Sequence, residues 1–144
     1  MAELVITRIF DAPREMVYQA FVDPDQLSQW FGPVGWSVPR DTVDINAQVG
    51  GYQRITMVND DDPTMTSPAS GTLIEVVENE LLVAQEVVDT PDGSLTMTLR
   101  LEFHDEGGKT RLVLRQGPYD EVLGGHAREG WLSSFTKLDA LLAR

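Results

Sequence analysis

Few side chains in this sequence could carry acid–base or metal chemistry. The two histidines, His104 and His126, lie far apart and lack the close His–Glu–His spacing of a zinc motif. No GxSxG nucleophile elbow, glycine-rich phosphate loop or dinucleotide fingerprint is present, and cysteine is absent. We therefore predict no catalytic residue set, no metal site and no cofactor, and the balance favours a protein that is not an enzyme.

One carboxylate, Glu75, lies on a predicted strand from which it could reach the interior. A buried carboxylate has either a raised pKa or a cationic partner, and either would mark a functional position. The alternative is that Glu75 pairs with an arginine at the edge of the sheet. His126 is the other candidate acid or base, but helix geometry turns it away from the apolar face of the last helix.

A group of aromatic residues, Trp30, Phe31 and Trp36, lies where a helix connects to the first strands of the sheet. One interpretation is ordinary core packing. The other is that one or two of these side chains line the mouth of a binding pocket, because large aromatic groups beside Gly–Pro turns combine apolar area with a polar N–H.

Composition narrows the classes of partner. The chain has 144 residues and a formal net charge of −12, whereas nucleic acids and anionic membranes attract clustered Lys and Arg. No apolar run approaches the ~20 residues that a membrane helix needs. We therefore expect no nucleic-acid binding and no membrane insertion. The length predicts a single domain over residues 1–144, and the absence of cysteine is typical of a cytoplasmic protein.

The periodicity of apolar residues predicts the elements that position these candidates. We expect a strand over 3–10, two short helices divided at Asp23–Pro24, and a turn at Pro91-Asp92-Gly93. Residues 59–69 are expected to form a solvated loop. Further strands are predicted over 41–46, 52–58, 71–77, 81–89 and 94–104, and a last one follows Gly107–Gly108.

Residues 94–104 alternate most clearly, with Leu95, Met97 and Leu99 on the same face as Leu101 and Phe103. In the last strand, Leu112 and Leu114 are predicted to point inward. One buried face and one solvent-exposed face are typical of an antiparallel sheet that is covered on a single side.

The cover is predicted to be a long helix over 126–142, because its apolar residues share one face. This helix would span about 25 Å, which is enough to cross several strands. Its inward side chains include Trp131, Phe135 and Leu138. The predicted fold class is therefore α+β, with a curved antiparallel sheet, two short helices and a long C-terminal helix over a hydrophobic cavity.

The segment RIFDAPREMVYQAFVDPDQLSQWFGP, from Arg8 to Pro33, resembles the opening signature of the family named after the activator of Hsp90 ATPase. The residues that carry the resemblance are Arg8, Ala12–Pro13, Val17, Ala20, Asp23–Pro24, Leu27, Trp30 and Gly32–Pro33. Later matches are Gly50–Gly51, Gly71 with Glu75, Thr110-Arg111-Leu112 and Gly130–Trp131. The resemblance implies the helix-grip fold of the START-like superfamily, whose members serve as lipid or hormone carriers, polyketide cyclases and co-chaperone modules.

In the family that this chain resembles, the positions of Gln53, Ile55 and Met57 are typically apolar and face the helix. Gln53 interrupts that row. An amide that faces an apolar interior must find a partner or it costs about 1–3 kcal/mol. Gln53 could therefore bond a backbone group or water, or it could orient a ligand.

The leading hypothesis is a binding module for a small hydrophobic molecule. A cyclase- or hydrolase-like enzyme that acts within the same pocket is the first alternative, and a module that interacts with a chaperone ATPase is the second. Exposed sheet edges also allow a homodimer. The candidate ligand-binding residues are Trp30, Phe31, Trp36, Gln53, Ile55, Met57, Glu75, Met97, Leu99, Leu112, Leu114, Trp131, Phe135 and Leu138.

Overall fold

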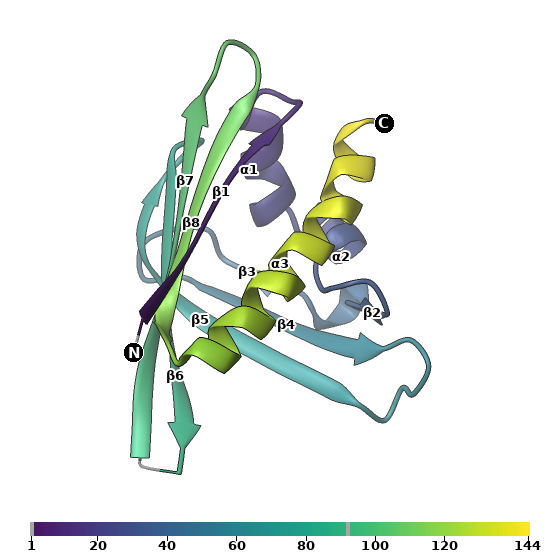
Figure 1. Ribbon diagram of the computed structural model, residues 1–144. Helices are drawn as coiled ribbons and strands as arrows, with labels where there is room; N and C mark the ends of the chain where they lie inside the picture. Colours follow the sequence, from purple (N-terminus) through teal and green to yellow (C-terminus); the bar gives the residue numbers. More distant parts are fainter. Residues whose placement is uncertain (1, 92) are drawn as a thin grey trace.

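The computed structural model describes residues 2–91 and 93–144, and it has the layered architecture that the sequence predicts (Figure 1). A curved antiparallel sheet lies on one side, and three helices cover its concave face. The strands are β1 (Ala2–Phe10), β2 (Trp36–Ser37), β3 (Asp44–Ile45), β4 (Tyr52–Asn59), β5 (Thr66–Val77), β6 (Leu81–Thr90), β7 (Gly93–Asp105) and β8 (Thr110–Tyr119). The helices are α1 (Arg14–Val22), α2 (Pro24–Trp30) and α3 (Glu121–Leu142), with a short 3-10 turn over Arg40–Thr42.

The strands follow the order β1-β8-β7-β6-β5-β4-β2, and β3 pairs with β4 beside this path. Every pairing is antiparallel. The register places Leu101 of β7 opposite Leu114 of β8 and Leu82 of β6, so inward side chains of neighbouring strands meet on one face. The predicted alternation over 94–104 is confirmed.

Helix α3 lies across the concave face and packs against β1, β8 and the two short helices. It begins at Glu121, earlier than the predicted residue 126. The side chain of Asp120 accepts a hydrogen bond from the Leu123 backbone N–H, which caps the helix. Gly124 and Gly125 have low helix propensity and concealed this first turn from sequence patterning.

The two short helices close one end of the layered structure. Asp23 ends α1 and caps α2, because its side chain accepts from the Asp25 backbone N–H. The indole N–H of Trp30 donates to the Ala20 carbonyl oxygen over 2.8 Å, which fixes α2 against α1. This bond satisfies the one polar atom of a fully buried Trp side chain.

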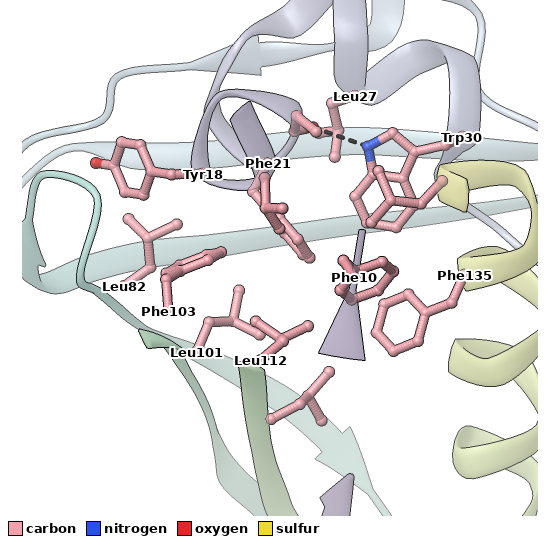
Figure 2. Packing of buried hydrophobic residues seen from close by; sticks show 14 of the residues in the cluster. Phe10, Tyr18, Phe21, Leu27, Trp30, Leu82, Leu101, Phe103, Leu112 and Phe135 are labelled. Carbon is pink, nitrogen blue, oxygen red and sulfur yellow. Dashed lines mark hydrogen bonds between the residues drawn. The ribbon is translucent and has the colours of Figure 1, made fainter. Parts of the chain in front are cut away.

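A dense aromatic core fills the space between these helices, α3 and the sheet (Figure 2). Phe10 and Phe135 make an edge-to-face contact with ring centroids 5.2 Å apart. Phe21 makes similar contacts with Trp30 at 4.8 Å and with Phe103 at 5.5 Å. Such contacts add to burial and make this end of the molecule solidly packed.

Two predicted segments differ from the structure. Residues 41–46 were expected to form one strand, but the 3-10 turn over Arg40–Thr42 leaves a strand only at Asp44–Ile45. The loop predicted over 59–69 is shorter, because β5 already begins at Thr66. Pro68 is accommodated in β5 because this part of the strand pairs with β4 and not with β6.

The sheet divides into two diverging hairpins at the end remote from the aromatic core. Pairing between β5 and β6 extends outward only to Thr72 and Gln85. Beyond these residues, β5 continues to pair with β4, and β6 continues to pair with β7 as far as Thr90 and Gly93. Figure 1 shows the β4–β5 hairpin pointing away from the β6–β7 hairpin. Asp92, in the predicted turn at 91–93, lies outside the described residues.

Candidate ligand-binding cavity

A cavity of about 740 Å³ lies between the sheet and α3, at the end where the two hairpins diverge. Its volume falls within the ~300–1,000 Å³ that is typical of small-molecule sites. Strands β4 to β8 supply most of the lining, and Phe21, Phe31 and Trp131 supply the helical side. The cavity exists because the helices fill only one end of the concave face.

The inner part of the cavity is apolar. Inward side chains of successive strands form its wall, namely Ile55, Leu73, Leu82, Leu99 and Leu101. Phe31 and Trp131 meet edge to face, with ring centroids 5.6 Å apart, and separate the cavity from the aromatic core.

The Trp131 indole N–H donates to the side-chain oxygen of Gln116 over 2.8 Å. Gln116 lies on β8 opposite Leu99, so it faces the same interior. The bond joins α3 to the sheet and orients the Trp131 ring along the cavity wall.

The outer end of the cavity opens to solvent. The lining there includes Pro91, Ser94 and Leu123, which are all exposed. Pro91 and Ser94 belong to the tip of the β6–β7 hairpin, and Leu123 belongs to the first turn of α3. A molecule could therefore enter between the hairpin tip and the start of the helix.

Gln53 contributes an amide to the lining. It lies opposite Gly71 of β5, which has no side chain to pack against it. Its side chain makes no hydrogen bond to any described residue, although it is only partly exposed. The amide can therefore both donate to and accept from a guest or a water.

A second polar group in the lining is Glu86. It lies opposite Met97 and follows Leu82 and Ala84 on the inward face of β6. Its Oε2 atom accepts a hydrogen bond from the Ser70 backbone N–H over 2.9 Å. This bond bridges the two hairpins close to the point where they diverge.

Tyr119, at the junction of β8 and α3, also lines the cavity. Burial raises the pKa of its phenol, and the negative charge of Glu86 raises that pKa further. The phenol is therefore neutral at physiological pH and can donate a hydrogen bond. Gly124 lets α3 approach closely, because a Cβ atom there would lie 3.4 Å from the Cβ of Tyr119.

Comparison with known proteins identifies the family. The family model described as Activator of Hsp90 ATPase homolog 1-like protein matches residues 11–143. The chain belongs to this family. A solved structure from Chromobacterium violaceum has a TM-score of 0.86 at 23% identity and covers 99% of this chain and 97% of that one. The AHSA1 protein from Silicibacter pomeroyi has a TM-score of 0.83 at 27% identity, with coverage of 99% and 98%. No curated protein matches the chain significantly.

Membership of the Hsp90-ATPase-activator homologue family confirms the resemblance carried by the segment from Arg8 to Pro33, and its solved structures confirm the helix-grip fold. The names of the two proteins above state no ligand and no reaction. No described helix is long and apolar enough to cross a membrane.

Six of the predicted site residues line the cavity, and whether they bind a ligand stays a prediction. They are Phe31, Gln53, Ile55, Met97, Leu99 and Trp131. Five others lie in the solid core instead, where they are fully buried; these are Trp30, Leu112, Leu114, Phe135 and Leu138. They face the predicted side, but buried side chains of α1, α2 and the C-terminal half of α3 pack together with them and fill that end of the concave face.

Trp36 and Met57 were expected near the cavity, and neither lines it. Trp36 lies in the short edge strand β2, and its carbonyl oxygen accepts a hydrogen bond from the Lys137 ammonium over 3.0 Å. The Met57 sulfur would lie 3.2 Å from a Cβ added at Gly32, so Met57 fills the space beside the Gly32 turn.

Glu75, a candidate ligand-binding residue that could have reached the interior, does not line the cavity. A β-bulge between Leu73 and Glu75 inserts one extra residue into β5. The alternation therefore reverses, and Val76 turns inward while Glu75 is exposed. The charge of Glu75 acts on Arg100, whose pKa is raised mainly by its hydrogen bond to Glu102. The alternative interpretation, a pairing with an arginine at the sheet edge, is not seen either: Arg100 lies on the internal strand β7, and Glu75 forms no ion pair with a described residue.

Neither histidine lines the cavity. His126 is exposed on α3, as its helical position predicted. The His104 ring lies 2.9 Å from a carboxylate oxygen of Glu102, on the same strand. Among the described residues, no group of three or more His, Asp or Glu side chains is placed to hold a metal ion.

Sequence reasoning missed Glu86, Gln116 and Tyr119 as parts of the lining. The signal for the first two was available, because Glu86 continues the alternation of Leu82 and Ala84, and Gln116 continues that of Leu112 and Leu114. Tyr119 carried no such signal, because its position depends on how the chain turns from β8 into α3.

Proposed function

We propose that this protein binds a small, largely apolar molecule in the cavity between the sheet and α3. The observation that carries the proposal is a cavity of about 740 Å³ with apolar inner walls and an outer end that opens to solvent. Membership of the Hsp90-ATPase-activator homologue family supports the proposal at the level of the fold.

Burial of apolar surface would supply most of the affinity. A guest that removes roughly 300 Å² of apolar surface from water gains about 7 kcal/mol at ~25 cal/mol per Å². Costs of association reduce this value, so we expect dissociation constants of roughly 10 µM to 1 mM for generic apolar probes. Gln53 would orient the guest, since its amide has no described partner.

The other two hypotheses have less support. A cyclase or hydrolase was predicted to use Glu75 or His126, and both side chains are exposed outside the cavity lining. Interaction with a chaperone ATPase rests on the family's name, and no feature of the cavity adds to it. The cytoplasmic location, the single domain and the homodimer stay predictions.

The test is a titration with N-phenyl-1-naphthylamine, a neutral probe whose fluorescence rises in apolar surroundings. We expect saturable binding to the wild-type protein. The variant Ala84→Phe should abolish it, because Ala84 lines the cavity and a ring there would occupy the space.

The matched control is Val87→Phe, which adds a similar side chain at an exposed position of the same strand, outside the lining. This variant should bind the probe as the wild type does. Equal binding to all three proteins, or no binding to the wild type, would contradict the proposal.

A further inference from the structure

We propose that the natural guest is an apolar molecule with a protonated amine, and that the Glu86 carboxylate at the outer part of the cavity receives this group. The inference rests on the proposed function and adds the chemical class of the ligand. It excludes fatty acids and other anionic amphiphiles as preferred guests.

The first argument is the charge of the lining. The lining contains two carboxylate residues, Glu86 and Asp120. Among the described residues that line the cavity, none is Lys, Arg or His. An anionic head group would therefore meet no counter-charge on entry, and it would face carboxylates in a partly desolvated space. The net charge of −12 adds repulsion at long range.

The arginines of the sheet do not compensate, because they lie on its outer face or at its other end. Arg100 pairs with Glu102, and Arg115 pairs with Glu3. Arg8 faces inward, but it forms a two-pronged pair with Asp139 in the packed half of the molecule. Each of these cations already has a carboxylate partner.

Arg128, further along α3, donates to the Val5 carbonyl oxygen and does not line the cavity. The N-terminus of α3 is another positive feature near the opening, since the helix dipole and free backbone N–H groups attract anions there. Two carboxylates offset the positive charge of this helix end. The Asp120 side chain caps the Leu123 N–H at 2.8 Å, and Glu121 adds a second carboxylate in the first turn. An anionic guest gains little from this helix end.

Glu86 has the geometry to accept a cation. One of its oxygens accepts from the Ser70 backbone N–H, which fixes the carboxylate between the two hairpins. The other oxygen makes no hydrogen bond to a described residue. Met97 lies opposite on β7, so an ammonium bound there would leave its alkyl body against apolar side chains. The nearby Tyr119 hydroxyl could also accept from the ammonium.

The experiment displaces N-phenyl-1-naphthylamine with three probes of equal chain length, decylamine, 1-decanol and decanoate, each below its aggregation concentration at pH 7. We expect decylamine to bind about tenfold more tightly than 1-decanol, and decanoate to bind weakest. The advantage of the amine should shrink between ~20 mM and ~500 mM salt, because the site is partly open to solvent.

The decisive variant is Glu86→Gln, which keeps an oxygen for the Ser70 N–H and removes the charge. This variant should lower the affinity for decylamine to that for 1-decanol and leave the affinity for 1-decanol unchanged. The control is Glu75→Gln, which makes the same change in net charge at an exposed position outside the lining. This control should keep the full preference for the amine.

The outcomes separate the two proposals. Binding of the fluorescent probe without any preference among the three competitors, or a preference for decanoate, would overturn the inference and leave the proposed function standing. An amine preference that survives in Glu86→Gln would also overturn it. Failure of the probe to bind at all would overturn the proposed function.

Discussion

A matched pair of truncations, Leu99→Ala and Leu114→Ala, should distinguish the hollow half of the molecule from the packed half. Both residues are leucines that face inward, on neighbouring strands. Leu114 is fully buried in the core, so its truncation leaves a new void and should cost about 3–5 kcal/mol. Leu99 is partly exposed and borders the cavity, where space in front of it already exists.

The cost at Leu99 is therefore mainly the lost transfer free energy. Three carbons at ~0.8 kcal/mol each give about 2.4 kcal/mol for complete burial, and partial exposure reduces this to about 1–1.5 kcal/mol. The two variants should differ by about 2 kcal/mol in the free energy of unfolding.

Urea denaturation provides the assay, and the difference corresponds to a separation of roughly 1 M between the two midpoints at unchanged slope. Leu99→Ala should also weaken binding of N-phenyl-1-naphthylamine. Equal destabilisation by the two truncations would refute the reasoning, because it would mean that Leu99 is packed on all sides.

Two further predictions concern polar groups. Thr110→Val should cost about 1–3 kcal/mol in urea denaturation, because the fully buried Thr110 hydroxyl donates to the Ala12 carbonyl oxygen at 2.7 Å, and a variant as stable as the wild type would contradict this role. Hydrogen bonds from Arg100 and then His104 lower the pKa of Glu102, so its stabilisation is complete above the ordinary carboxyl pKa and is lost as pH falls through the lowered value. Thermal midpoints recorded from pH 7 to pH 3 should therefore fall less steeply below pH ~4.3 in Glu102→Gln than in the wild type, and parallel curves would argue against it.

Apolar periodicity was sufficient to predict the strand over 94–104 and the inward row of β8. In a strand with one buried face, the alternation of apolar and polar residues determines which side chains face the core. The presence of a long C-terminal helix was equally predictable, but the residue at which it starts was not. Asp120 caps it, yet Gly124 and Gly125 interrupt the pattern that would have extended it back to Glu121.

The candidate site was less predictable, because its limits depend on three-dimensional features without a local signal. The bulge between Leu73 and Glu75 reverses the alternation of β5, so the face on which Glu75 lies could not be read from the sequence. The divergence of the hairpins beyond Thr72 and Gln85 decides where the interior is hollow. Leu114 and Leu99 lie in similar sequence patterns. The packing of the helices decides that Leu114 is a core residue and that Leu99 lines the cavity.

Methyl NMR of the methionines tests the central claim most directly, because they report on different places. Met97 lines the cavity, Met65 is exposed on the far hairpin, and Met16 lines a small second depression between α1 and the end of α3. On titration with 1-decanol, we predict that the Met97 methyl signal shifts in a saturable way, while those of Met16 and Met65 stay in place. A shift at Met16 with none at Met97 would contradict a guest between the sheet and α3.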